Sequence, residues 1–197
     1  MTPRTTLPAG SLLARIHFTT GPHPAAWNTW RTHGPLAIGR FDPHPLPITN
    51  HRVHGVIYAS LADGQVDPMT HCLAEVFQRD RTIALHRGTP TFTLFEISRE
   101  VSLLDLRAQA TSSEGRSATH VWARDAYRDT PPADGVLYPT GLAARPGVGA
   151  AMTSVCLWKR RRSCLPPQPI FSRPLADASL RGAVELAATQ LNYLLLV

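Results

Sequence analysis

The sequence is poor in cysteine and in lysine. Its 197 residues include only three cysteines, Cys72, Cys156 and Cys164, and a single lysine, Lys159. Because the cysteines show no C-x-x-C spacing, they predict neither a zinc site nor a disulfide framework, and we expect a reducing, cytoplasmic compartment. No apolar run reaches the roughly 20 residues needed to cross a bilayer, so we expect no membrane anchor.

Several motifs with well-defined chemistry are also missing from the sequence. No G-x-G-x-x-G follows an expected strand, so a Rossmann dinucleotide site is not supported. No H-E-x-x-H spacing and no G-x-S-x-G elbow occur, which argues against a zinc hydrolase and against a serine-hydrolase triad. The histidines gather in the first part of the chain without metal-ligand spacing, and we expect no metal.

The positive charge of the chain comes almost wholly from arginine, and the formal net charge is +6 at pH 7. An arginine-rich balance suits recognition of phosphates and carboxylates, because the guanidinium fork binds both groups bidentately. A coding bias of the source organism explains it equally well. The basic run from Lys159 to Arg162 is short and has no DNA- or RNA-binding motif beside it, so direct nucleic-acid binding is not expected.

Length and an apolar fraction of 43% fit one folded domain. We expect an N-terminal tail over residues 1–10 and a domain over residues 11–197. Short strands and helices alternate irregularly, which favours a mixed α+β domain over a doubly wound sheet. The expected strands cover 11–18, 53–61, 92–98, 102–106, 135–138, 152–158 and 175–180. The expected helices cover 24–31, 117–128 and 181–196, and a further helix opens after Asp67.

The helix after Asp67 has the clearest local signals. Asp67 is a preferred capping residue, and Pro68 suits the first helical position. An apolar stripe follows at helical spacing, and Glu75 lies on its flank, where it can reach the edge of a cleft. The stripe consists of Met69, Cys72, Leu73, Val76 and Phe77.

Three segments in order carry the strongest functional signal. They are the turn Gly39-Arg40-Phe41-Asp42, the strand Val56-Ile57-Tyr58-Ala59-Ser60 and the helical segment Leu73-Ala74-Glu75-Val76-Phe77. An arginine can grip a pyrophosphate, a tyrosine can stack on a flat ring, and a glutamate can stabilise a sugar cation. This order and these flanking residues resemble the RES domain family.

The resemblance implies a fold and a function. Members of that family are toxins of bacterial toxin–antitoxin pairs that consume NAD+, and their fold is similar to that of the ADP-ribosyltransferases, with short strands in a split sheet and flanking helices. NAD+ is then a substrate, and no cofactor is implied. The implied protein partner is an Xre-like antitoxin that blocks the cleft. Whether the chain forms a homo-oligomer stays open.

The resemblance also assigns roles to residues. It implies catalytic roles for Glu75 at the ribose, Arg40 at the pyrophosphate and Tyr58 against the nicotinamide. It implies that Arg15, Arg40, Tyr58 and Thr140 bind the substrate. On the residues alone, Arg15 could equally form a salt bridge, and Tyr58 could equally pack in the core.

The position of the family's serine is where this chain departs from the pattern. Thr140 follows Gly135-Val136-Leu137-Tyr138-Pro139 at that position, and Ser154 is a second candidate. Threonine keeps the hydroxyl and adds a methyl group, which leaves catalytic competence open. Three functions are therefore carried forward: an enzyme that degrades NAD+ with water or phosphate as acceptor, an ADP-ribosyltransferase acting on a protein, and a binding domain of the same fold without activity.

Overall fold

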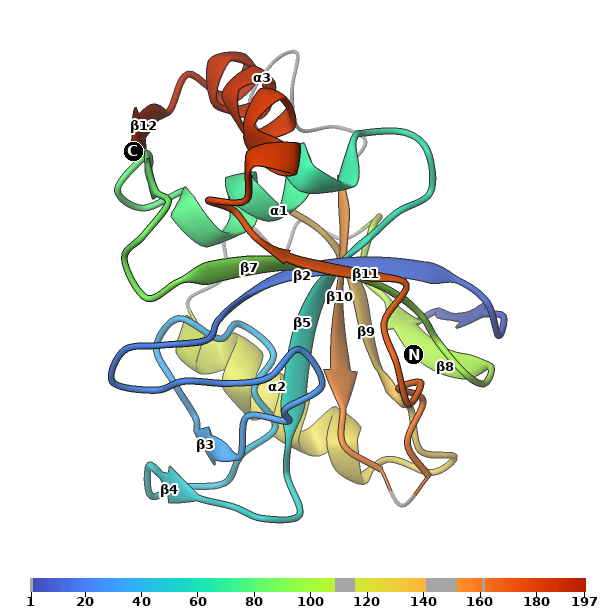
Figure 1. Ribbon diagram of the computed structural model, residues 1–197. Helices are drawn as coiled ribbons and strands as arrows, with labels where there is room; N and C mark the ends of the chain where they lie inside the picture. The colour runs from blue at the N-terminus through green and yellow to red at the C-terminus, as the bar shows by residue number, and fades with distance from the viewer. Residues whose placement is uncertain (1, 109–115, 141–151, 161) are drawn as a thin grey trace.

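An eight-stranded sheet organises the chain (Figure 1). The computed structural model describes residues 2–108, 116–140, 152–160 and 162–197. The strand order is β1-β8-β9-β10-β5-β2-β7-β11, and the neighbours are antiparallel except for β8 and β9. The strands are β1 (Arg4–Leu7), β2 (Leu12–Phe18), β5 (Val56–Leu61), β7 (Pro90–Glu96), β8 (Val101–Asp105), β9 (Gly135–Pro139), β10 (Thr153–Trp158) and β11 (Phe171–Pro174).

Two small sheets complete the strand inventory of the described residues. β3 (His33–Gly34) pairs with β4 (Thr49–Asn50), and β12 (Leu194–Leu196) pairs in parallel with β6 (Thr82–Ala84). The helices are α1 (Pro68–Phe77), α2 (Arg116–Arg128) and α3 (Arg181–Leu191), with a 3-10 turn, η1 (Ala178–Leu180), before α3. None of the helices in this part of the chain has the length and apolar character needed to cross a bilayer. The predicted mixed α+β domain is confirmed.

The large sheet is held together at its middle by a short contact. β2 pairs with β5 only through Leu13 with Leu61 and Ala14 with Ser60, whereas it pairs with β7 along its whole length. Beyond that contact the two halves diverge, and Figure 1 shows β2, β7 and β11 crossing the direction of β5, β10 and β9. The strands nevertheless form one continuous sheet, and the predicted split sheet of an ADP-ribosyltransferase-like fold stays a prediction.

Alternation along β5 decides which side chains face the helices. Successive strand residues point to opposite faces of a sheet. Tyr58 and Ser60 share one face, where Cys72 of α1 donates to Ser60 and Tyr58 packs against the core cluster that includes residues of α2. Ile57 and Ala59 face the other way, into a separate core. α1 and α2 thus cover different parts of one face, with α3 packed outside α1.

The predicted start of α1 is confirmed. The Asp67 carboxylate accepts a hydrogen bond from the backbone N–H of Thr70 at 2.8 Å, and Pro68 occupies the first helical position. On the side turned to the sheet, Leu73 and Ala74 are fully buried. This burial fixes the rotation of the helix, so Glu75 lies half-buried beside the core rather than within it.

The N-terminal boundary was wrong for residues 4–7. This segment, expected in a tail, forms β1 and pairs with β8 from Val101 to Leu104. Leu7 joins the core on the face away from α1. Strand β8 would otherwise leave its backbone groups unpaired at the edge of the sheet, and β1 satisfies them.

The helix expected over 24–31 was also wrong. This segment forms turns, because its polar groups bind partners other than a helical ladder. The N–H of Ala26 donates to the hydroxyl of Thr29 at 3.0 Å, and the carbonyl of Trp27 accepts from Arg15 at 3.0 Å. Trp27 packs its ring against Phe95 with the centroids 5.3 Å apart.

The C-terminal elements differ from the prediction as well. The last strand of the large sheet is β11, earlier than the expected 175–180, because Asp177 caps the following 3-10 turn by accepting from the N–H of Ser179. The last helix ends at Leu191 rather than at 196. Asn192 takes a left-handed conformation with φ of 54°, which ends the helix, and β12 then pairs with β6.

Candidate functional site

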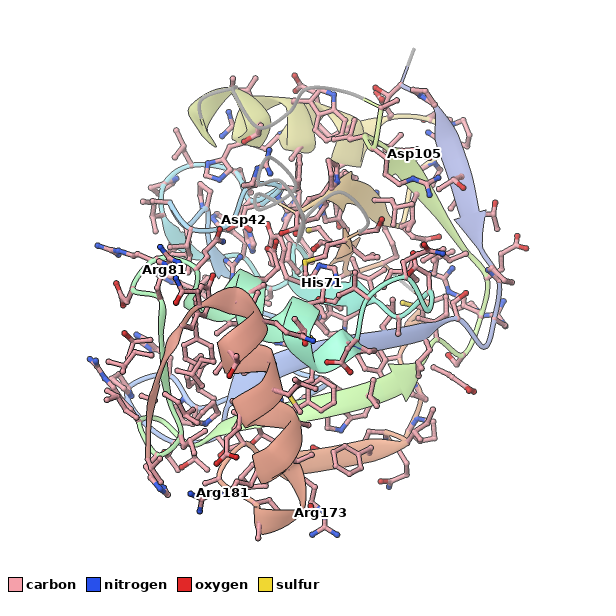
Figure 2. All side chains as sticks on the ribbon, turned by 90° about the horizontal axis from the view of Figure 1, so that it is seen from above. Asp42, His71, Arg81, Asp105, Arg173 and Arg181 are labelled. Atoms are coloured by element: carbon pink, nitrogen blue, oxygen red, sulfur yellow. The ribbon has the colours of Figure 1, made fainter. Side chains whose placement is uncertain are left out.

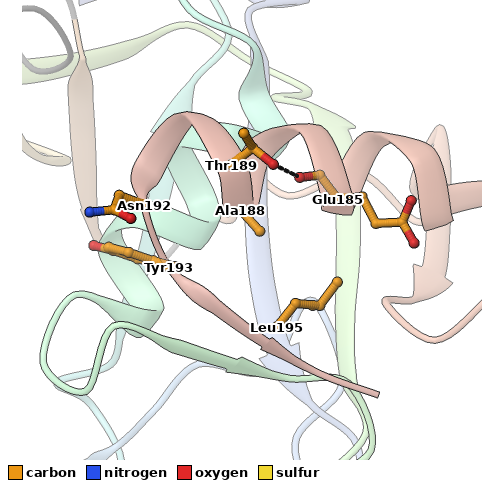
Figure 3. Close-up of a pocket in the computed structure, with 6 residues that line it drawn as sticks. All are labelled: Glu185, Ala188, Thr189, Asn192, Tyr193 and Leu195. Atoms are coloured by element: carbon orange, nitrogen blue, oxygen red, sulfur yellow. Dashed lines mark hydrogen bonds between the residues drawn. The ribbon is translucent and has the colours of Figure 1, made fainter.

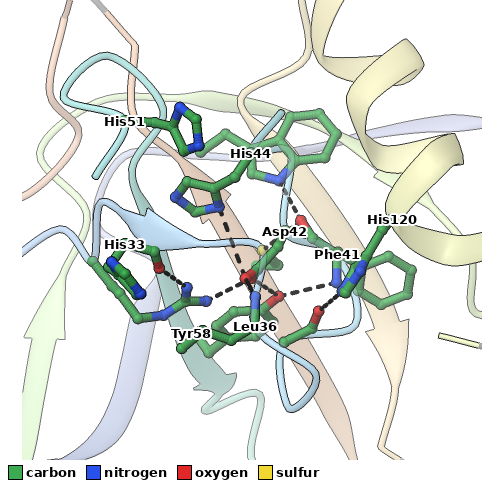
Figure 4. Close-up of polar contacts among 12 residues, drawn as sticks. His33, Leu36, Phe41, Asp42, His44, His51, Tyr58 and His120 are labelled. Atoms are coloured by element: carbon green, nitrogen blue, oxygen red, sulfur yellow. Dashed lines mark hydrogen bonds and ion pairs between the residues drawn. The ribbon is translucent and has the colours of Figure 1, made fainter. Parts of the chain in front are cut away.

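The turn that carries Arg40 is built around the buried carboxylate of Asp42 (Figure 4). Asp42 is fully buried and accepts three hydrogen bonds, from Nη2 of Arg31 at 2.6 Å, from the N–H of Leu36 at 2.9 Å and from the hydroxyl of Tyr58 at 2.9 Å. The ring of His44 lies 3.8 Å from the same carboxylate. Because a buried charge is costly unless it is paired and hydrogen-bonded, these donors fix both the carboxylate and the loop around it.

The backbone on both sides of Arg40 is fixed by side chains from three other elements. The N–H of Phe41 donates to the Tyr58 hydroxyl at 3.0 Å, and Nε1 of Trp158 donates to the carbonyl of Phe41 at 3.0 Å. Nε2 of His120, on α2, is hydrogen-bonded to the carbonyl of Gly39. The turn is therefore anchored to β5, β10 and α2 at once.

The Arg40 guanidinium extends from this turn across two aromatic rings. Its Cζ lies 5.4 Å from the ring centroid of Phe41 and 5.9 Å from that of Tyr138. The two rings pack against each other with centroids 4.7 Å apart. Such distances are typical of cation–π contacts, which favour a defined position for the cation.

Glu75 and Thr140 meet from opposite sides of the same region. The Thr140 hydroxyl donates to the Glu75 carboxylate, which joins α1 to the end of β9. Thr140 is almost fully buried, and its N–H donates to the carbonyl of Met152 at 3.1 Å. Its position just after β9 is thus set also by the backbone of Met152, the residue before β10.

Tyr138 links the arginine and the glutamate electrostatically. It lies two residues before Thr140 and is buried. Burial raises the pKa of Tyr138 well above its usual value; the negative charge of Glu75 raises this pKa further, and the positive charge of Arg40 lowers it. Arg40 lies over the ring of Tyr138, and Glu75 accepts from Thr140 two residues further along the chain, so these four residues form one group.

A buried polar layer lies beneath this group. Cys72 donates to the hydroxyl of Ser60 at 3.5 Å, and Nε2 of His71 lies 3.1 Å from the hydroxyl of Ser154. Figure 2 places His71 and Asp42 near the centre of the fold, between α2 and α3. Burial lowers the pKa of His71 to about 4, so its ring is neutral at pH 7.

Sequence reasoning missed most of this layer. Ser60 lies two residues after Tyr58 and so shares its face of β5, and His71 lies one helical turn before Glu75. Those two spacings were readable in the sequence. The pairing of His71 with Ser154 was not, because it joins a helix to a strand 83 residues later.

Tyr58 is placed beneath the turn rather than beside Glu75. Its hydroxyl donates to Asp42 and accepts from the N–H of Phe41. Burial raises the pKa of Tyr58 well above its usual value, so the hydroxyl stays protonated and can donate. The geometry thus connects Tyr58 with Arg40 through the backbone of the turn.

Arg15 is directed elsewhere. By alternation it lies on the face of β2 opposite to Ala14, and Nη1 of Arg15 donates to the carbonyl of Trp27 at 3.0 Å. Its Nε is buried and has no hydrogen-bond partner among the described residues, which also contain no acid at ion-pair distance from it. Burial lowers the pKa of Arg15 to about 10, so the group remains charged at neutral pH.

The basic run at the end of β10 has internal partners. Nζ of Lys159 donates to the carbonyl of Arg52 at 3.2 Å. Nε of Arg160 donates to the carbonyl of Ala133 at 2.8 Å, and its Cζ lies 3.9 Å from the ring centroid of Tyr127. Lys159 therefore connects the end of β10 with the segment before β5, and Arg160 connects it with the end of α2.

Two of the hollows on the surface of the described residues lie away from Glu75 and Arg40. One, of about 310 Å³, lies along α3 between Glu185 and Leu195 (Figure 3). The other, of about 660 Å³, lies between Arg99 and Arg160. In the second hollow, Arg99 forms a close ion pair with Asp134 at 2.6 Å and Arg160 donates to the carbonyl of Ala133, so these two of its three arginines have structural partners.

Electrostatics and hydrogen bonding thus single out one group as the candidate site. It combines a carboxylate, a guanidinium, a phenol and a hydroxyl, and the described residues include no cluster of side chains suited to a metal. No family model matches the chain, and no curated protein or solved structure matches it significantly.

Proposed function

We propose that this protein cleaves the nicotinamide–ribose bond of NAD+, with water or inorganic phosphate as acceptor. The contact between Thr140 and Glu75 carries the proposal. It fixes a carboxylate at the meeting point of α1 and β9, near the Tyr138 phenol and the Arg40 guanidinium. This is the set of groups that the cleavage requires, and the RES-family resemblance selected Glu75, Arg40 and Thr140 independently of their positions in space.

Glu75 would stabilise the sugar cation. As the bond breaks, nicotinamide leaves with the bonding electron pair, and positive charge develops on the ribose ring. A carboxylate held in a partly dehydrated site stabilises that charge more strongly than one in water. A carboxylate has about four acceptor positions, so the bond from Thr140 is compatible with a second bond from a ribose hydroxyl. Water or phosphate then forms the new bond to the ribose carbon, and water loses a proton.

Arg40 would hold the diphosphate. A guanidinium presents a rigid fork that matches phosphate oxygens, and the rings of Phe41 and Tyr138 limit where it can lie. The positive charge of Arg40 would also balance the negative charge of the diphosphate. Tyr138 supplies an aromatic surface between the two groups.

An Xre-like antitoxin is proposed as the protein partner on the same resemblance. The loop around Arg40 exposes apolar side chains that such a partner would cover. Ile38 is 73% exposed, and Leu46 and Ile48 are exposed as well. Transfer of ADP-ribose to a protein stays the alternative activity.

The test is an assay of purified protein with NAD+, with and without phosphate, followed by mass spectrometry of nicotinamide and the ribosyl products. Glu75→Gln should abolish nicotinamide release. Glu96→Gln, which alters an exposed glutamate at the end of β7, should leave it unchanged. No loss of NAD+ under any condition, with no ADP-ribose attached to protein, would refute the proposed activity and favour a binding domain without catalysis. ADP-ribose found only on protein would favour the transferase.

A further inference from the structure

We infer that Asp42 is a positioning residue for Arg40. Tyr58 has the same role through its hydrogen bonds to Asp42 and to the N–H of Phe41, rather than a direct contact with nicotinamide. The inference rests on the proposed function only in naming what Arg40 holds, the diphosphate of the substrate. The placement of the loop itself is a separate claim. It follows from a chain of contacts that begins at the buried carboxylate and ends at the two residues flanking Arg40.

The carboxylate of Asp42 brings together three segments that are distant in the chain. Arg31 donates to it from the segment before β3, Leu36 donates a backbone N–H from within the loop, and Tyr58 donates its hydroxyl from β5. Removal of any donor would leave a buried charge less well compensated, which is costly. The loop therefore has one well-satisfied arrangement around this group.

The Tyr58 hydroxyl connects the Asp42 carboxylate with the backbone next to Arg40. The same oxygen that donates to Asp42 accepts from the N–H of Phe41. Phe41 is fully buried, and its carbonyl accepts from Trp158. One neighbour of Arg40 is thus fixed at both of its backbone polar groups.

The other neighbour is fixed by close packing. A Cβ placed on Gly39 would lie 2.2 Å from Oδ1 of Asp42, so the turn is packed directly against the carboxylate. The carbonyl of Gly39 is also hydrogen-bonded to His120. With both neighbours fixed, the backbone of Arg40 cannot shift without breaking this network, and ordering a binding group in advance saves the cost of ordering it at binding.

A double-mutant cycle tests whether Asp42 acts through Arg40. The binding of ADP-ribose, which carries the diphosphate and lacks nicotinamide, is measured by calorimetry for wild type, Asp42→Asn, Arg40→Ala and the double variant. We expect Asp42→Asn to weaken binding about tenfold when Arg40 is present and less than about twofold in the Arg40→Ala background, as coupled neighbours do. Equal weakening in both backgrounds would overturn the inference.

The matched control is Asp134→Asn. Asp134 is likewise paired with an arginine, Arg99, and likewise accepts from a backbone N–H, that of Ser102, but it lies away from the site. It should lower stability and leave the affinity for ADP-ribose unchanged. A comparable loss of affinity in Asp134→Asn would mean that the effect of Asp42 is general destabilisation.

Backbone hydrogen exchange separates the loop from the proposed activity. Tyr58→Phe removes the acceptor for the Phe41 N–H and leaves the acceptor for the Leu36 N–H in place. We expect faster exchange at Phe41 in Tyr58→Phe and at both positions in Asp42→Asn. If the wild-type protein does not bind ADP-ribose, the proposed function fails. Unchanged exchange at Phe41 in both variants would instead overturn the positioning role.

Discussion

Arg40 and Arg160 both lie against aromatic rings, but they are held in opposite ways. Arg160 is held by its own side chain, which lies 3.9 Å from the ring centroid of Tyr127 and donates to the carbonyl of Ala133. Arg40 lies 5.4 Å from the ring centroid of Phe41, and its position follows from hydrogen bonds made by its neighbours in the turn. Main-chain carbonyls accept directly from the Arg160 guanidinium, whereas the hydrogen bonds that order the turn of Arg40 are made by Gly39 and Phe41.

The comparison also bears on two arginine-containing signals in the sequence. The run from Lys159 to Arg162 has the higher local charge, and Gly39-Arg40-Phe41-Asp42 has only one basic residue. Within the run, Lys159 and Arg160 connect the end of β10 with its surroundings, whereas Arg40 lies near the ring of Tyr138.

Of the residues compared in this section, Arg40 should have the largest effect on activity when it is replaced. Arg40→Ala is expected to lower kcat/KM for NAD+ by about 10²-fold, because a charge-assisted contact to the diphosphate is lost at the transition state. The melting temperature should change little, since the turn is anchored by its neighbours. Steady-state nicotinamide release and a thermal melt of the same sample measure both quantities. A large fall in melting temperature with normal turnover would place Arg40 with Arg160 as a structural arginine.

Replacement of Arg160 should show the converse pattern. Arg160→Ala is expected to lower the free energy of unfolding by about 2 kcal/mol, because two carbonyls lose their donor and the Tyr127 ring loses its cover. Turnover of NAD+ per folded molecule should remain within about twofold of wild type. Denaturant unfolding beside the activity assay measures this. Lost turnover without lost stability would contradict the contrast between the two arginines.

Local signals in the sequence predicted the local part of the structure. Asp67 and Pro68 specify the start of α1 through contacts within one helical turn, so the helix and the flank position of Glu75 were predictable. The pairing of β1 with β8 brings together residues as far apart in the chain as Arg4 and Leu104, and no local signal encodes it. The tail predicted over residues 1–10 was wrong at residues 4–7 for that reason.

The same distinction applies to the candidate site. Glu75, Arg40 and Thr140 were identified through their flanking residues, and the structure brings them together near Tyr138. The directions of the Arg15 and Tyr58 side chains were not predictable. Their hydrogen bonds are accepted by Trp27 and Asp42, which lie in loops whose path is set by tertiary packing.

Replacement of Tyr58 should have an intermediate effect that sharpens the contrast. Tyr58→Phe is expected to raise KM for NAD+ about fivefold with little change in kcat, because it loosens the turn around Arg40 without removing an aromatic surface. Stability should fall by about 1 kcal/mol for the lost hydrogen bonds. Tyr127→Phe, which removes a hydroxyl that donates to Lys159, is the matched control and should leave KM unchanged. A fall in kcat alone would indicate instead that Tyr58 contacts the nicotinamide ring directly.

Replacement of Thr140 should have the smallest effect when its hydroxyl is kept. Thr140→Ser retains the donor to Glu75 and removes only a methyl group from a buried position, so nicotinamide release should stay within about threefold of wild type or rise. Thr140→Val, which keeps the shape and removes the donor, should lower activity about tenfold, since loss of one net hydrogen bond corresponds to roughly 1.4 kcal/mol. Equal activity in the serine and valine variants would show that the hydroxyl does not hold the carboxylate in the reacting state. A collapse of nicotinamide release in Thr140→Ser would show that the threonine methyl, not its hydroxyl, shapes this side of the site. Glu75 would then be positioned by packing, as Arg160 is positioned in part by the ring of Tyr127.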